Sequence, residues 1–148
     1  MSRVLIIGYG NPLRGDDGLG WQAAERLAVE LTDPEIEIKA VHQLTPELAE
    51  PLSRTSLAIF IDAAARGEPG AVLRRPLSPA NGEAAFTHQA TPAALLAMSR
   101  VLFGRAPEAV LFSVPVESAA FGHRLSPVVQ QAMERLCEEI SAMLAPRV

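Results

Sequence analysis

A glycine-rich stretch directly after a short aliphatic run constrains this chain more than any other feature. Residues 4–7 are Val-Leu-Ile-Ile and end at Gly8, a pattern typical of a central strand buried on both faces. From Gly8 to Gly20 the chain reads Gly-Tyr-Gly-Asn-Pro-Leu-Arg-Gly-Asp-Asp-Gly-Leu-Gly, which brings the adjacent Asp16 and Asp17 to the start of a helical pattern. A strand, a sharp turn and a helix in this order predict the first unit of an α/β sheet.

The rest of the chain continues this alternation of strand and helix. A second aliphatic run over residues 57–61 predicts another buried strand, with Asp62 at its carboxyl end. Apolar and polar residues alternate over 36–40, which predicts a half-exposed strand near an edge of the sheet. A weaker strand is predicted over 71–73, and a further apolar strand runs from 109 towards 116.

Helices are predicted where apolar residues recur at helical spacing. The first runs from Asp16 or Asp17 to about Leu31, and residues 76–90 are expected to be an irregular loop. Three further helices are predicted to begin at Thr45-Pro46 (to about Arg54), Thr91-Pro92 and Ser126-Pro127. Thr45 and Ser126 are predicted as N-caps, each followed by Pro at the first helical position. The expected fold is one α/β domain over residues 1–148, a three-layer sandwich with a mostly parallel, twisted sheet of about five strands flanked by helices.

Composition narrows the class of function. The chain is 49% hydrophobic and 5% aromatic, so its core must be aliphatic, and its formal net charge is −4. No basic cluster is longer than Arg74-Arg75, which argues against nucleic acid or an anionic membrane surface as a partner. The apolar start is too short for a signal peptide, and no stretch approaches the roughly 20 apolar residues of a membrane span, so a cytoplasmic location is expected. Cys137, the single cysteine, is expected in the core of the last helix rather than as a nucleophile.

The glycine-rich stretch can be interpreted in two ways. A dinucleotide-binding fingerprint would need a third glycine where Leu13 stands, and the carboxylates of Asp16 and Asp17 would repel a phosphate from the helix start. The glycines are better explained as positions where the backbone turns sharply and approaches another polypeptide closely. One aspartate is enough to cap the helix, and we assign this role mainly to Asp16, which leaves Asp17 free to point across the strand ends.

Asp62 and the histidines are the other candidate functional residues. Asp62 either caps the turn after its strand or, beside Asp17, shares a proton or holds a cation. His88 lies in a polar loop, where the alternative to a functional role is a chance surface position. Because the carboxyl ends of strands converge in an open α/β sheet, two carboxylates and an imidazole there would form a hard, oxygen-rich metal site with one nitrogen ligand. His42 and His123 are weaker candidates for substrate contacts.

These residues resemble the motifs of the hydrogenase maturation endopeptidases, which trim the large-subunit precursor of nickel-iron hydrogenases. The resemblance rests on the Gly8–Gly20 stretch, then on Ile61-Asp62-Ala63, and then on Thr87-His88 followed by an apolar helix. Ser113-Val-Pro-Val-Glu117 and Leu125-Ser126-Pro127 are similar to the last strand and the last helix start of that family. The motifs cover nearly the whole chain in the expected order.

The resemblance implies an α/β sandwich and an activity. The family's metal-contacting residues carry over to Asp17, Asp62 and His88, which would recognise a nickel ion that the precursor carries and that the free enzyme need not retain. Cleavage would then remove a carboxy-terminal extension of the precursor. Many relatives have Glu at the position of Asp17, and many have a Gly-Thr-containing loop where this chain has residues 42–47. These departures bear on which hydrogenase is recognised rather than on the reaction.

Several alternatives stay open at this point. The nickel would polarise the scissile carbonyl or activate water, or it would only position the substrate while Asp17 or Asp62 acts as general base. The same site would serve a non-catalytic, nickel-dependent checkpoint or chaperone that binds the precursor without cutting it. A nucleotide-binding module is the third possibility. A monomer is expected, because no long apolar helix face is evident in the sequence.

Overall fold

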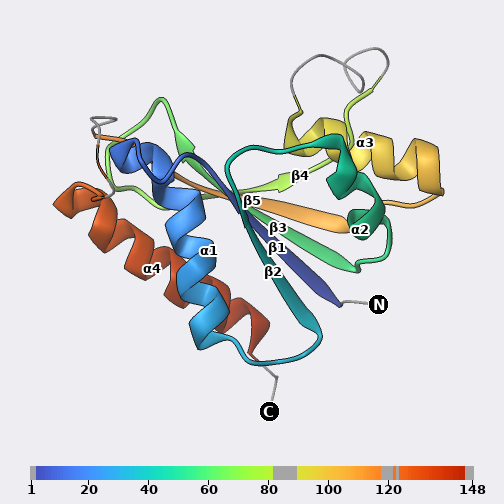
Figure 1. Ribbon diagram of the computed structural model, residues 1–148, viewed down its shortest axis with the longest axis horizontal. Coiled ribbons are helices and arrows are strands. Elements are labelled where there is room, and N and C mark those ends of the chain that lie inside the picture. Colours follow the sequence, from blue (N-terminus) through green and yellow to red (C-terminus); the bar gives the residue numbers. More distant parts are fainter. Residues whose placement is uncertain (1–2, 82–89, 118–121, 123, 146–148) are drawn as a thin grey trace.

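The fold is described from a computed structural model, whose described residues are 3–81, 90–117, 122 and 124–145 (Figure 1). Strands and helices alternate along the chain, as the sequence predicts. The strands are β1 (Val4–Tyr9), β2 (Ile36–Val41), β3 (Leu57–Ala64), β4 (Leu73–Leu77) and β5 (Glu108–Pro115). The helices are α1 (Leu19–Glu30), α2 (Ala49–Ser53), α3 (Pro92–Phe103) and α4 (Pro127–Leu144), with short 3-10 helices η1 (Gly15–Gly18) and η2 (Pro46–Leu48) before α1 and α2.

The five strands form one sheet in the order β2-β1-β3-β5-β4. Strands β1, β2, β3 and β5 are parallel, and only β4 runs antiparallel to its neighbour β5. The predicted α/β class, strand number and mostly parallel sheet are therefore confirmed. The prediction for residues 36–40 is also confirmed, since β2 lies at an edge of the sheet.

Strand β4 is the element that the sequence described least well. The prediction was a strand over 71–73 and an irregular loop from 76, whereas the observed strand covers Leu73–Leu77. Pro76 made a strand look unlikely at this point, because proline cannot donate a hydrogen bond to a ladder. In an edge strand the missing N–H need not cost a hydrogen bond, because one side of the strand has no neighbouring strand to pair with.

The sheet separates two aliphatic cores. Helices α1 and α4 cover one face and α2 and α3 cover the other, which gives the predicted three layers (Figure 1). Alternate residues of one strand serve the two cores: in β3, Ile59 and Ile61 face α1 and α4, while Ala58 and Phe60 face α2 and α3. Cys137 is 1% exposed within the first core, which confirms its predicted place, and burial raises the pKa of its thiol to about 12.

The three predicted proline-marked helix starts are present, but their capping differs. The Thr91 hydroxyl caps α3 by accepting a hydrogen bond of 3.1 Å from the Ala94 N–H, whereas the predicted N-caps Thr45 and Ser126 occupy their positions without a side-chain bond to their own helices. The helix predicted to start at Thr45-Pro46 is divided into η2 and α2, and Pro51 explains the division because it lacks the N–H that would continue the hydrogen-bond ladder. Among the described residues, no helix has the length and apolar character needed to cross a membrane.

Candidate functional site

The candidate site lies where the carboxyl ends of β1 and β3 meet. The chain leaves β1 through α1 on one face of the sheet to form β2, and it returns through α2 on the other face to form β3 (Figure 1). The connections therefore diverge to opposite faces next to the β1–β3 pair. In open α/β sheets, ligands bind at such a topological switch point.

Glycines bring α1 into direct backbone contact with these two strands. A Cβ at Gly20 would overlap the carbonyl oxygens of Ile61 in β3 and Tyr9 in β1, and a Cβ at Gly8 would overlap the carbonyl oxygen of Gly20. Gly10 has a φ of 148° and faces the backbone of Asp17 in the same way. The glycines do permit a close backbone approach, but to the chain's own backbone, and the predicted approach to another polypeptide stays a prediction.

Asp16 does not have the role that the sequence predicted for it. It was expected to cap the helix that follows it, yet neither η1 nor α1 has a side-chain cap hydrogen bond. Its carboxylate is 0% exposed and instead accepts hydrogen bonds from the N–H of Glu117 (2.9 Å), the N–H of Ser126 (2.7 Å) and the hydroxyl of Ser126 (2.8 Å). Asp16 thus serves the start of α4, about 110 residues further along the chain.

Asp17 is the more exposed carboxylate of the site, and its expected direction across the strand ends stays a prediction. Its side chain is 41% exposed, and one carboxylate oxygen lies 3.8 Å from the Nε of Arg14. An exposed ion pair of this length contributes little to stability. The Asp17 carboxylate is therefore available to a ligand.

Asp62 is the more enclosed carboxylate of the site. Strand β3 continues to Ala64, so Asp62 lies within the strand rather than after it, at the point where pairing with β1 ends and pairing with β5 goes on. The Tyr9 hydroxyl donates a hydrogen bond to it. Burial raises the pKa of Asp62 to about 6, hydrogen bonds from Tyr9 and from the Ala63 backbone lower it, and the negative charge of Asp17 raises it. Asp17 and Asp62 thus lie close enough to interact electrostatically.

Of the three histidines, only His42 lies among the described residues. His88 and His123 lie outside the described residues, so the predicted contribution of His88 stays a prediction. His42 is exposed after β2, and its ring packs edge-on against Trp21 with 5.0 Å between ring centroids. The expectation that His42 contacts substrate is not tested by this contact.

A metal fits the two carboxylates on physical grounds. Two like charges in one cleft repel, and a divalent cation with a preference for oxygen ligands would remove that repulsion. Within residues 3–81, 90–117, 122 and 124–145, no three His, Cys, Asp or Glu side chains form a group able to hold a metal ion. A third ligand would have to come from outside the described residues, where His88 is the predicted candidate, or from the substrate.

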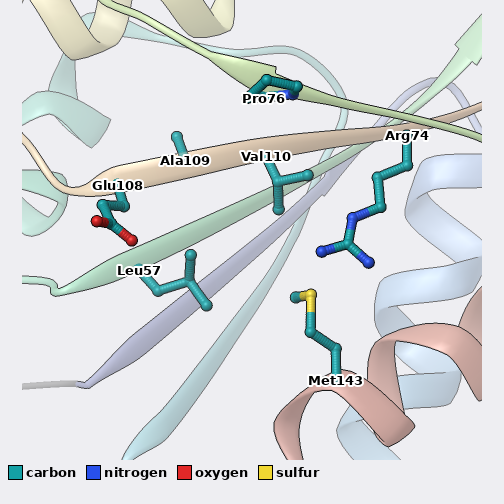
Figure 2. Close-up of a pocket in the computed structure, with 7 residues that line it drawn as sticks. All are labelled: Leu57, Arg74, Pro76, Glu108, Ala109, Val110 and Met143. Carbon is teal, nitrogen blue, oxygen red and sulfur yellow. The ribbon is translucent and has the colours of Figure 1, made fainter.

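One hollow of the surface lies away from this site. It has a volume of about 370 Å³ and is bordered by Leu57 and Glu108, the first residues of β3 and β5. Figure 2 shows these two side chains at one end of the hollow and Arg74 with Met143 at the other. The hollow is therefore at the amino edge of the sheet, whereas Asp17 and Asp62 are at the carboxyl edge.

Sequence reasoning missed two participants. Tyr9 was given no role, although it follows Gly8, whose register partner Ile61 precedes Asp62 in the neighbouring strand, and it interacts with Asp62. Ser126 was predicted as an N-cap, and it does occupy that position, but its hydroxyl bonds to Asp16 instead of to its own helix. No local pattern indicated that partner.

Comparison with known proteins gives structural matches only. No protein-family model and no curated protein sequence matches the chain. The fold resembles a [NiFe] hydrogenase maturation protease, HycI, from Thermococcus kodakarensis KOD1, with a TM-score of 0.77 and 26% identity over 97% of this chain and 92% of that one.

Two further solved structures have lower identity and therefore bear on the fold alone. The hydrogenase maturating endopeptidase HybD from E. coli has a TM-score of 0.75 and 23% identity, covering 96% of this chain and 91% of its own. The hydrogenase 2 maturation peptidase from Thaumarchaeota archaeon SCGC_AB-539-E09 has a TM-score of 0.73 and 21% identity, covering 97% and 99%. These two neighbours support the fold, and the first match, at 26% identity, supports the family that the motifs indicated, the hydrogenase maturation proteases.

Proposed function

We propose that this protein is an endopeptidase that removes the carboxy-terminal extension of a nickel-iron hydrogenase large-subunit precursor after nickel insertion. The observation that supports it best is the meeting of Asp17 and Asp62 at the switch point of a fold shared with hydrogenase maturation proteases. The relatives' names supply the substrate class, and the two carboxylates supply a physical reason for a metal-bearing substrate.

Nickel enters this proposal as part of the substrate. Asp17, Asp62 and His88 would complete the coordination of an ion that the precursor already holds, through two oxygen ligands and one nitrogen ligand. A precursor without nickel would meet two carboxylates that repel each other and offer it no favourable contact. Discrimination between loaded and empty precursor follows from this difference.

Hydrolysis in this proposal uses water as the nucleophile. Cys137 is buried under α1 with a pKa of about 12, so it does not supply a thiolate. Water adds to the carbonyl carbon of the scissile peptide, the C–N bond breaks, and the departing amine takes up the proton that the water loses. A site carboxylate within hydrogen-bond reach of that water would relay the proton.

The decisive experiment is incubation with nickel-loaded precursor, followed by intact mass measurement. We expect one discrete carboxy-terminal loss, which requires nickel and is reduced at least about 100-fold by Asp17→Asn or Asp62→Asn. Glu25→Gln is the matched control, because it neutralises an exposed carboxylate on α1 and should leave cleavage unchanged. An unchanged mass with a loaded cognate precursor would refute the protease, and nickel-dependent binding without cleavage would favour the checkpoint.

A further inference from the structure

We propose that Asp16 is a positioning residue, which locks the loop carrying Asp17 onto the start of α4 and so fixes the Asp17 carboxylate relative to Asp62. The inference deepens the proposed function, on which its catalytic consequence depends. Its structural part, the lock itself, can be tested without any substrate.

The lock consists of hydrogen bonds to two separate segments. Asp16 Oδ2 accepts from the Glu117 N–H and the Ser126 hydroxyl, and Oδ1 accepts from the Ser126 N–H, at 2.7–2.9 Å. A carboxylate that is 0% exposed must be satisfied in this way, because leaving it unpaired in the interior would be far more costly than exposing it. The three bonds therefore hold Asp16, and the backbone on either side of it, in one place.

Asp16, which is distant in the sequence, supplies the hydrogen-bond acceptor that the start of a helix usually obtains from a neighbouring residue. In a capping box, a Glu or Gln three residues after the N-cap accepts a hydrogen bond from the N-cap N–H. In α4 that position is Val129, which has no acceptor, and the Asp16 carboxylate takes its place at the Ser126 N–H. Its negative charge at the amino end of an 18-residue helix adds a favourable interaction with the helix dipole.

The consequence for Asp17 follows from the backbone. Asp17 is the next residue of the same 3-10 turn, and its exposed ion pair with Arg14 is too long to orient the side chain firmly, so the direction of its carboxylate depends on where the turn is held. Backbone hydrogen bonds from Gly15 to Gly122 and from Gly122 to Leu13, both 2.9 Å, hold the preceding residues to the same side of the molecule. Residues that orient a metal-contacting side chain commonly affect metal affinity or activity by about 10–100-fold.

Ser126→Ala is the variant that tests the lock with least disturbance. The Ser126 hydroxyl makes no cap bond to α4, so its removal deletes a bond to Asp16 while helix capping by that side chain is not at stake. Ser99→Ala is the matched control: it deletes a buried hydroxyl bond of 2.7 Å, from Ser99 to the Arg105 carbonyl, at the far end of α3. Ser126→Thr restores a hydroxyl at the tested position.

The readouts are hydrogen–deuterium exchange of residues 11–18 in the free protein and kcat/KM on nickel-loaded precursor. We expect Ser126→Ala to increase exchange there at least 5-fold and to lower kcat/KM about 10-fold, with recovery in Ser126→Thr and no such changes in Ser99→Ala. Unchanged exchange in Ser126→Ala, or an equal loss of kcat/KM in Ser99→Ala, would overturn the proposal. A wild type that cleaves nothing refutes the proposed function instead, and the exchange data then still decide whether the lock exists.

Discussion

The two edges of the sheet are built in opposite ways. At the carboxyl edge, α1 lies against β1 and β3 with backbone touching backbone, and glycines occupy the contact points. At the amino edge, α3 ends at Gly104 with open space around it, and Val101, Leu102 and Phe103 are 61%, 58% and 49% exposed. The comparison teaches that tolerance to substitution differs within one fold, because Gly8 and Gly20 leave no room for an added Cβ whereas Gly104 does.

The largest effect is expected from Gly20→Ala. Alanine is the better helix former, by about 1 kcal/mol, but its Cβ would overlap the carbonyl oxygens of Ile61 and Tyr9, which belong to central strands and cannot move independently. We expect a net loss of more than about 3 kcal/mol in unfolding free energy, or failure to fold. Thermal unfolding followed by circular dichroism measures it, and a variant as stable as wild type would contradict the close contact.

Asp62→Asn should stabilise the metal-free protein at neutral pH while abolishing cleavage. The pKa of Asp62 is raised from 3.8 to about 6, so the folded state binds its proton more tightly than the unfolded chain does. Below about pH 4 both states are protonated and Asp62 has no effect; its ionisation destabilises the fold progressively between pH 4 and 6 and fully above. We therefore expect a gain on the order of 3 kcal/mol at pH 7 that vanishes near pH 4.

Denaturant titrations at several pH values, in the presence of EDTA, measure this gain. Glu25→Gln again serves as the control, and its stability difference from wild type should not follow the same pH profile. A gain for Asp62→Asn that is equal at pH 4 and pH 7 would show that ionisation is not its cause.

Gly104→Ala tests the amino edge with the same substitution as at Gly20. No atom lies within 4 Å of the added Cβ, so the cost comes only from the φ of 84°, a left-handed conformation that alanine adopts with difficulty. The expected loss is roughly 1 kcal/mol. If Gly104→Ala proved as harmful as Gly20→Ala in thermal unfolding, the contrast between the two edges would be lost.

Leu102→Gln should have the smallest effect. The side chain is 58% exposed on α3, and glutamine is also a good helix former, so the change in unfolding free energy should stay within about 0.5 kcal/mol. A matched variant on the same helix is Leu95→Ala, whose side chain is fully buried and which should cost about 2–5 kcal/mol. Similar losses in both variants would mean that Leu102 is covered in solution.

The fold could be predicted from the sequence because a buried strand or helix shows its burial in the types of a few adjacent residues. The aliphatic runs of β1 and β3 and the proline-marked helix starts each follow from a few adjacent residues, and the order of these elements determines the class. Strand β4 was placed too early because Leu73–Leu77 contains two arginines and a proline, a composition that only an edge strand accepts.

The candidate site was less predictable because its contacts are not local. Asp17 was proposed from its place at the start of a helical pattern and Asp62 from its place after an aliphatic run, and both are properties of single segments. The partner of Asp16 was not found, since the rule that an aspartate caps the nearest helix ignores a serine 110 residues away. The contribution of His88 to the site remains a prediction.

The bond between Asp16 and Ser126 also has a consequence for the order of assembly. It closes a loop over most of the chain, so the amino-terminal turn cannot take its final place before the beginning of α4 has been synthesised and has reached it. A ribosome-bound chain that stops before Ser126 would carry the glycine-rich stretch and Asp62, but Asp16 would lack its bonds to the start of the last helix. Contacts of such long sequence separation form late and slow folding, so the protein would acquire its activity only when nearly all of it exists.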